Sequence, residues 1–198
     1  DYDRAKSIGK VRGFLGPFGV FVRSYAFIRA YGPALREMSE VAVLNANYLL
    51  AQLRGAYDLP FDRLCMHEFV LSARRLKREH GITALDVAKR LMDYGFHPPT
   101  IYFPLIVPEA LMIEPTETET KETLDAFCDA MIAIAREAAD QPELLKEAPH
   151  HRPVRRLDEV RAVKQPVVKY EFEPHPEPEP AAERAAEPAA PVSAEAPK

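Results

Sequence analysis

Residues 82–118 constrain the fold of this chain more than any other stretch, because they combine signals that start and stop a helix. Thr83 and Asp86 have the spacing of a capping box, in which each side chain bonds a free backbone N–H of the first helical turn. Gly95 stands where a helix needs a left-handed residue to end. We therefore expect a short helix that begins after Thr83 and ends near Gly95.

A rigid turn follows at residues 97–100, with the sequence His-Pro-Pro-Thr. Two successive prolines exclude helix and favour an extended backbone at the residue before them. A second turn at residues 107–110 separates two short apolar runs, which predicts a hairpin of two short strands. The turn therefore presents His97 and Thr100 at the start of a strand. Two interpretations remain open: these side chains are functional, or the turn is purely architectural.

Apolar patterns before this stretch predict two helices and one further strand. Residues 18–31 are apolar nearly all round, which is typical of a helix covered on most sides, so we expect a second subunit or another domain to cover it. A second helix is expected from Pro33 to near Gly55. The alternation over residues 63–72 predicts a strand with His67 on its apolar face, where a hydrogen-bonded core histidine is commoner than a ligand.

The order of these elements predicts an α+β fold: two N-terminal helices, then a small, mainly antiparallel sheet of about three strands covered by helices on one face. The basic run at residues 74–80 is interpreted as a solvated connection. A long amphipathic helix after residue 120 is expected to cover the sheet. Its apolar stripe consists of Leu124, Phe127, Met131, Ile134 and Ala138.

Changes in composition divide the chain into four segments. We expect a helical lead-in at 1–55, a small α/β domain at 56–148 and an extended trailing segment with a short helical turn at 149–170. Residues 171–198 are mostly Pro, Glu and Ala, which predicts a disordered tail.

The formal net charge of -4 provides no broad basic field, so neither nucleic acid nor a membrane is expected as a partner. No membrane span is recognised. Cys65 and Cys128 lie in apolar patterns without metal-ligand spacing, which predicts packed, reduced thiols and a cytoplasmic location. His150 and His151 lack a third ligand nearby, so no metal site is predicted. Because the sequence starts at Asp1, without a methionine, we expect a piece of a longer polypeptide.

Several separate stretches, in the same order, resemble the C-terminal region of the glycine cleavage system P-protein, a pyridoxal-phosphate-dependent glycine dehydrogenase (decarboxylating). The resemblance covers about residues 6–170 and excludes the Pro/Glu/Ala tail. Its end, PVRRLDEVRAVKQPVVKY, is similar to that of the second subunit in bacteria that divide the enzyme between two chains. The other matching stretches are 7–33, 43–53 (VLNANYLLAQL), 65–70 (CMHEFV) and 86–138, which contains FHPPTIYFP and MIEPTETET.

The resemblance implies the small C-terminal domain of an aminotransferase-like (fold type I) enzyme, in which that domain closes over pyridoxal 5'-phosphate held by a larger one. The lead-in at 1–55 would then come from the cofactor domain. In this family glycine loses its carboxylate as carbon dioxide, and the aminomethyl group passes to the lipoyl arm of the H-protein. The implied partners are P-protein subunit 1, the lipoylated H-protein and glycine.

The sequence departs from the family at the catalytic lysine. The family's Schiff-base lysine lies in a His-Lys-Thr or His-Lys-Ser context, which no lysine of this chain has. We therefore predict no catalytic residue here and little or no activity for the chain by itself. The alternative, from a different class, is a non-catalytic interaction module that dimerises through residues 18–31.

The resemblance also suggests residues near the substrate or the lipoyl channel. The candidates are His97, Thr100, His67 and Arg90. Arg23 and Arg29 are further candidates for binding a carboxylate, because the guanidinium fork matches that group.

Overall fold

The computed structural model describes residues 4–9 and 15–170. Its contacts separate two units, Asp1–Arg156 and Leu157–Lys198. Within residues 157–170, the second unit has a short helix, α7 (Glu159–Lys164), whose start is capped by the Asp158 carboxylate. The predicted disordered tail at 171–198 lies outside the described residues.

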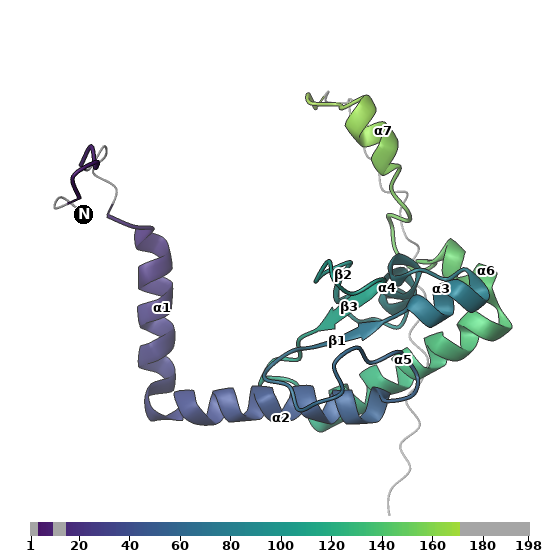
Figure 1. Cartoon of the computed structure of the whole chain (residues 1–198), viewed down its shortest axis with the longest axis horizontal. Helices are drawn as coiled ribbons and strands as arrows, with labels where there is room; N and C mark the ends of the chain where they lie inside the picture. Colours follow the sequence, from purple (N-terminus) through teal and green to yellow (C-terminus); the bar gives the residue numbers. More distant parts are fainter. Residues whose placement is uncertain (1–3, 10–14, 171–198) are drawn as a thin grey trace, which may run out of the picture. The chain divides into compact units, whose positions relative to one another are not determined.

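The first unit begins with the two helices that the sequence predicts, α1 (Phe18–Tyr31) and α2 (Leu35–Leu53) (Figure 1). A short 3-10 turn, η1 (Gly32–Ala34), joins them and contains the predicted proline at its start. Helix α2 buries one side in the core, whereas α1 buries no residue. The apolar side chains of α1 are therefore exposed to solvent within this chain; Phe18, for example, is 78% exposed.

Three short strands form the sheet: β1 (Phe69–Ser72), β2 (Thr100–Ile101) and β3 (Ala110–Ile113). Their order is β1-β3-β2, and both pairings are antiparallel. This confirms the predicted small antiparallel sheet and the hairpin after the turn at 97–100. Phe69 and Leu71 of β1 pair with Ile113 and Leu111 of β3, and all four are buried, so the core lies against this face of the sheet. Val70 and Met112 on the other face are half-buried, although Ser72 and Ala110 at the end of the pairing are buried as well.

The strand predicted at residues 63–72 is wrong in its first half, because residues 63–68 form a loop. The Asn47 side chain of α2 explains the difference. Its Oδ1 accepts a hydrogen bond from the backbone N–H of Cys65 (3.0 Å), and its Nδ2 donates to the Cys65 carbonyl (2.8 Å). This backbone is therefore bonded to a helix side chain and not to a neighbouring strand. His67 consequently lies in a loop, exposed, and not on the apolar face of a strand.

The basic run at residues 74–80, which the sequence predicts to be a solvated connection, is a helix. That prediction is wrong. Helix α3 (Arg74–His80) starts where the Ser72 hydroxyl accepts a hydrogen bond from the Arg74 N–H (3.2 Å). It ends at Gly81, whose φ of 71° is left-handed. One buried side chain, Leu76, attaches it to the core, so its cations occupy the solvent side of a packed element.

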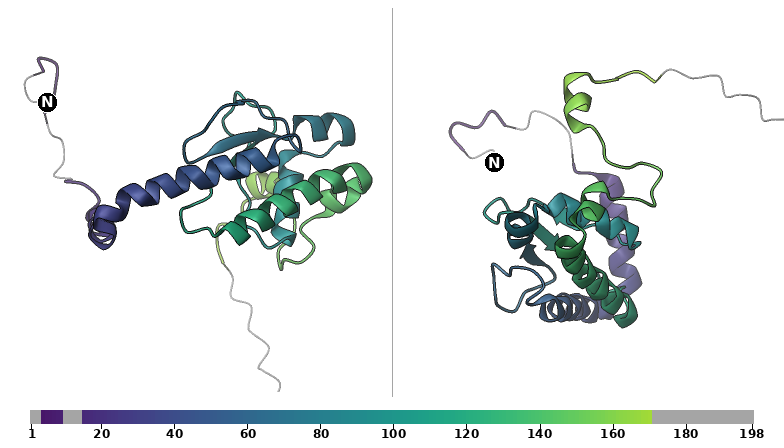
Figure 2. Two further views of the ribbon diagram at one scale, coloured as in Figure 1. Left: turned by 90° about the horizontal axis from the view of Figure 1, so that it is seen from below. Right: turned by 90° about the vertical axis from the view of Figure 1, so that its right-hand side faces the viewer.

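Three further helices complete the first unit: α4 (Ala84–Asp93), α5 (Lys121–Asp140) and α6 (Pro142–Glu147). The capping box at the start of α4 is confirmed, and Gly95 has the expected positive φ of 88°. Helices α2 and α5 lie side by side against the sheet (Figures 1 and 2). The stripe predicted for α5 is buried, except that Phe127 is half-buried. The predicted α+β architecture is thus correct in its main features.

Two buried polar side chains tie these elements together. The Tyr57 hydroxyl donates to the Met131 carbonyl in α5 (2.9 Å), and burial raises the pKa of Tyr57 above its ordinary value. Glu109, in the turn before β3, accepts a hydrogen bond from the N–H of Ala84 (2.8 Å) and another from Lys77. One carboxylate therefore joins the hairpin turn to the start of α4 and to α3.

The last part of the first unit is held against α4 and α6 by arginines. The Arg156 guanidinium donates to the carbonyls of Leu145 (2.8 Å) and Ala148 (2.9 Å). It also forms an ion pair with Asp86, the carboxylate of the capping box (2.7 Å). Arg152 donates to the carbonyl of Met92 at the end of α4 (2.7 Å). In the described parts of the chain, no helix is long and apolar enough to cross a membrane.

Candidate functional site

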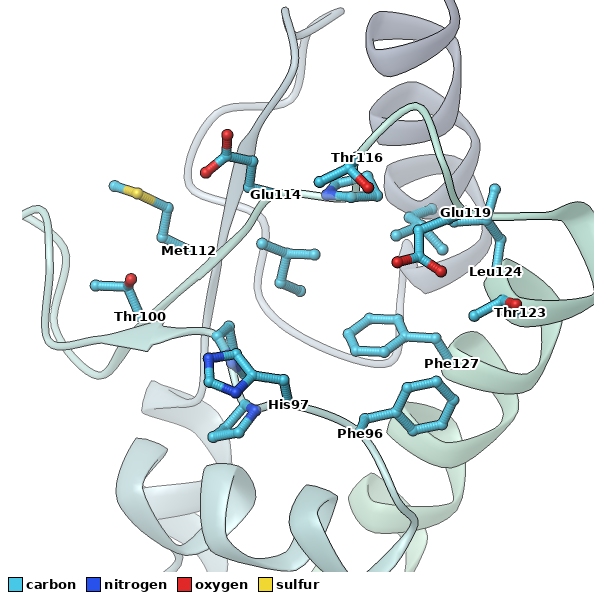
Figure 3. A pocket seen from close by; sticks show the side chains of 15 residues that line it. Phe96, His97, Thr100, Met112, Glu114, Thr116, Glu119, Thr123, Leu124 and Phe127 are labelled. Carbon is cyan, nitrogen blue, oxygen red and sulfur yellow. The ribbon is translucent and has the colours of Figure 1, made fainter. Parts of the chain in front are cut away.

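An open hollow of about 420 Å³ lies at one end of the sheet. The turn at 96–100, the end of β3, the loop at 114–119 and the first turns of α5 surround it (Figure 3). Its walls therefore come from residues 96–127, to which α2 adds Leu49 from a distant part of the sequence.

The walls of the hollow are stiff. Three of the residues that line it are prolines, at positions 98, 99 and 115, and proline fixes its own backbone φ angle. The loop at 114–119 is held from beneath by Asn45 of α2, which is only 7% exposed. Its Nδ2 donates to the carbonyl of Thr116 (2.9 Å) and lies 3.5 Å from that of Glu119. The hollow is therefore largely preformed, as small-molecule sites usually are.

The floor of the hollow is apolar. The rings of Phe96 and Phe127 meet edge to face, with centroids 5.4 Å apart. Buried core side chains complete the floor, namely Leu49, Ile113 and Leu124. The hollow is therefore an opening onto the hydrophobic core, with both aromatic rings at its surface.

Acidic and neutral polar groups surround this floor. His97 and Thr100 are both exposed, on the side of the turn. Across the hollow, the carboxylate of Glu119 points into the space above Phe127 (Figure 3). Neither the Glu119 carboxylate nor the His97 ring has a hydrogen-bonding or ionic partner among the residues that the structure describes. No lysine or arginine lines the hollow.

The structure brings two of the four predicted site residues to the hollow. His97 and Thr100 line the hollow. His67 does not line it, but its Nε2 lies 3.9 Å from Oε1 of Glu114, which does. Arg90 lies elsewhere, in a separate polar cluster, and does not line the hollow. Arg23 and Arg29 lie on α1 and are exposed.

Arg90 forms hydrogen bonds and ion pairs with carboxylates of the same unit. Its Nε and Nη2 atoms donate to the two oxygens of Glu137 (2.8 and 3.0 Å), and Nη1 donates to Asp93 (3.2 Å). Tyr94 places its ring 5.0 Å from the guanidinium and donates its hydroxyl to Glu137 (2.6 Å). The two carboxylates raise the pKa of Arg90 above its ordinary value. The guanidinium fork is thus occupied by partners from within the domain.

Asp93 is the centre of this cluster. Its Oδ1 accepts from the backbone N–H groups of His150 (2.7 Å) and His151 (3.0 Å), and its Oδ2 lies 2.9 Å from the Nδ1 of His150. Burial disfavours the ionised carboxylate, but the hydrogen bonds from His151, His150 and Arg90 outweigh that effect and lower the pKa of Asp93 to about 2. The cluster fastens the start of the trailing segment to the end of α4.

The cysteines show no sign of reactivity. Both thiols are free, and Cys128 is buried in α5, where burial raises its pKa to about 11. Cys65 is half-buried, and desolvation raises its pKa as well. Across residues 4–9 and 15–170, no three His, Cys, Asp or Glu side chains gather where they could hold a metal ion.

Sequence reasoning did not identify the acidic and aromatic sides of the hollow. The sequence assigns Phe127 only to the core stripe of α5 and does not mark Glu119 as a site residue. A signal did exist: Phe96 next to His97 lies at the same turn as the predicted functional residues. What the sequence lacks is the contact between Phe96 and Phe127, which depends on how α5 crosses the sheet.

The fold and the hollow define a small α+β domain with a preformed surface site at one end of its sheet. A sequence model of the family "Glycine dehydrogenase, C-terminal domain" matches residues 38–150. The chain therefore belongs to this glycine dehydrogenase family of oxidoreductases, and the resemblance to the P-protein is confirmed.

Curated relatives support the same assignment. The chain is 60% identical over 172 residues to "Probable glycine dehydrogenase (decarboxylating) subunit 2" of Bacillus velezensis, which covers 86% of this chain and 35% of the relative. Proteins of the same name from Alkaliphilus oremlandii (60% over 173 residues, 87% and 35%) and Caldanaerobacter subterraneus subsp. tengcongensis (62% over 171 residues, 86% and 35%) are similar to the chain to the same degree. The chain thus spans about a third of the length of these relatives.

Proposed function

We propose that this chain is the C-terminal part of subunit 2 of a pyridoxal-phosphate-dependent glycine dehydrogenase (decarboxylating) that works in the cytoplasm. The complete enzyme would decarboxylate glycine and pass the aminomethyl group to the lipoylated H-protein, with P-protein subunit 1 as its partner. The observation that carries this proposal is the identity of about 60% to relatives named as subunit 2, over 86% of the chain.

The residues that line the hollow do not fit the phosphate of pyridoxal 5'-phosphate. Two carboxylates line this hollow and would repel the phosphate group, and no lysine or arginine lines it to offset them. No lysine of the chain lies in the family's His-Lys-Thr or His-Lys-Ser context either. We therefore infer that the cofactor is held outside these 198 residues.

The proposed contribution of this chain is to bind and to exclude water. The stiff turn at 97–100 and the loop at 114–119 form a wall that can close against a cofactor-bearing region. His97 and Thr100 would face that region and offer an imidazole and a hydroxyl for hydrogen bonds to its ligands. The role of Arg90 as a substrate contact stays a prediction, and its engagement with Glu137 and Asp93 favours a structural role.

A chimera tests this proposal directly. The region of the Bacillus velezensis subunit 2 that matches this chain is replaced by residues 1–198, and the product is combined with subunit 1, H-protein and pyridoxal 5'-phosphate. The exchange of labelled carbon dioxide with glycine is measured. We expect activity within about tenfold of the unmodified enzyme, whereas the isolated 198-residue chain should give none.

The controls separate misfolding from lack of function. Circular dichroism and the visible absorbance of the bound cofactor report whether the chimera folds and binds pyridoxal 5'-phosphate. A chimera that folds and binds the cofactor but does not decarboxylate glycine would refute the proposal. Activity of the isolated chain would refute the inference about the missing lysine.

One observation favours a second function, that of an interaction module. The apolar side chains of α1 are exposed in this chain, and exposed apolar surface of this kind marks contact sites. Sedimentation of the purified chain distinguishes the two proposals. A stable dimer that Phe21→Asp and Phe27→Asp disrupt supports the module. A monomer supports coverage of α1 by another part of the enzyme.

A further inference from the structure

We propose that the hollow beside α5 binds an alkylammonium group, meaning a primary amine cation on an unbranched apolar stem, as in a lysine side chain. This inference deepens the proposed role of the same hollow and rests on the proposal that the hollow is a binding surface. Its test measures binding to the chain itself, so that it succeeds or fails independently of enzyme activity.

The floor of the hollow suits the apolar stem. Leu49, Ile113 and Leu124 are buried core residues that reach the hollow, and the rings of Phe96 and Phe127 extend this apolar surface. A chain of methylene groups laid on such a floor removes apolar area from water on both sides.

The charge of the hollow selects the cation. The Glu119 carboxylate points into the space above the Phe127 ring, and no described residue pairs with it (Figure 3). Glu114 adds a second carboxylate to the lining, and no lysine or arginine opposes either of them. An ammonium group placed here gains a charge-assisted hydrogen bond from its own N–H to Glu119 and lies near an aromatic ring.

The same features exclude other ligands. A carboxylate or phosphate group would meet two like charges. A purely apolar ligand would leave the Glu119 carboxylate to lose part of its hydration without a new partner. Only a ligand that is cationic at one end and apolar along its length satisfies both sides of the hollow.

The backbone around the hollow is held in place before a ligand binds. Prolines stiffen the turn and the start of the loop, and Asn45 fixes the loop from beneath through the carbonyl of Thr116 (2.9 Å). A preformed site loses little conformational entropy when its ligand binds. The backbone that carries Glu119 is therefore held in place beside Phe127 before the ligand arrives.

The test is an NMR titration of the full ¹⁵N-labelled chain. Three probes are added in turn: n-hexylamine, the neutral isostere n-hexanol, and the peptide acetyl-Gly-Lys-Gly-amide. We expect n-hexylamine or the peptide to shift the amides of residues 96–100 and 114–119 with millimolar affinity. The n-hexanol should bind more weakly, and only the binding of the cations should weaken when salt is raised.

Variants assign the effect to the proposed carboxylate. Glu119→Gln should raise the Kd of the cationic probe about threefold to fivefold, as expected for a partly exposed ion pair. The matched control is Glu147→Gln, a change of an exposed glutamate on α6 that does not line the hollow, and it should leave the Kd unchanged. Both positions are exposed, so neither change is expected to prevent folding.

Each outcome decides the proposal. Binding of the peptide alone points to a lysine side chain of a polypeptide as the natural ligand, and binding of n-hexylamine alone points to a small amine. Either result, with its loss in Glu119→Gln, supports the inference. Equal binding of n-hexanol, an unchanged Kd in Glu119→Gln, or no shifts around the hollow with any probe would overturn it, even if the chimera decarboxylates glycine.

Discussion

Replacing Asp93 by asparagine should destabilise the chain strongly, although the two side chains have nearly the same shape. The Asp93 side chain is 2% exposed and accepts four hydrogen bonds, from two backbone N–H groups, the His150 ring and Arg90. An asparagine can keep the two backbone bonds through its oxygen. Its NH₂ group would then face Arg90, which is itself only a donor.

The magnitude follows from the pKa of Asp93. Its hydrogen bonds lower that pKa from 3.8 to about 2 in the folded chain. A shift of this size corresponds to about 2 kcal/mol of folding free energy, which is present above pH 4 or so and is lost as the pH falls towards 2. Asparagine has no such charge, so we expect Asp93→Asn to lower the free energy of unfolding by about 2–3 kcal/mol at pH 7.

Urea unfolding followed by circular dichroism at a series of pH values measures both effects. The difference in stability between the wild type and Asp93→Asn should shrink by about 2 kcal/mol as the pH falls from 5 to 2. Asp129→Asn, a change of an exposed aspartate on α5, is the control and should cost less than about 0.5 kcal/mol. A constant difference across this pH range, or a loss equal to that of the control, would refute the reasoning.

Three further changes test other parts of the structure. Asn45→Ala should cost about 1–2 kcal/mol and speed amide exchange in the loop at 114–119, because it removes a buried donor; protection unchanged in that loop would contradict its role. Tyr57→Phe should cost about 1 kcal/mol in urea unfolding, since it removes one buried hydrogen bond, and a stabilised variant would contradict this. Arg156→Ala should lower the melting temperature by several degrees. Arg156→Lys should recover this only in part, because the compact ammonium lacks the separated Nε and Nη2 donors that reach the two carbonyls and Asp86; equal melting temperatures would argue against the ion pair.

Local signals in the sequence predicted much of the fold. The capping box at Thr83, the stop at Gly95 and the prolines after His97 act over a few residues, and the structure contains all of their consequences. The bounds of α1 also agree with the apolar run at 18–31. These signals are strong because they depend on the backbone geometry of single residues.

Two predictions from the sequence, the strand at 63–72 and the connection at 74–80, are wrong because the outcome depends on contacts with residues elsewhere in the chain. The alternation over residues 63–72 is typical of a strand. However, the side chain of Asn47 in α2 forms hydrogen bonds with the backbone N–H and carbonyl of Cys65, and these groups are then not available for pairing with a strand. No local pattern around Cys65 predicts that contact. The basic run at 74–80 looked solvated because six of its seven side chains are polar or charged, and a single buried Leu76 was enough to make it a helix of the domain.

The candidate site was predicted only in part for the same reason. His97 and Thr100 were identified because the turn that holds them is local. Glu119 and Phe127 belong to the site only because α5 crosses the sheet at this end, and Asn45 supports it from a helix about seventy positions earlier in the chain. No local pattern encodes such a crossing.

The ion pair between Arg156 and Asp86 has a consequence for where this domain can be cut. Asp86 is needed to begin α4, and the same carboxylate receives an arginine that lies six positions beyond the end of the family match at residue 150. A fragment trimmed to the matched region would therefore lose an anchor at the first turn of a helix deep in its interior. An autonomous fold should therefore include Arg156, and its boundary lies beyond the end of the family match at residue 150.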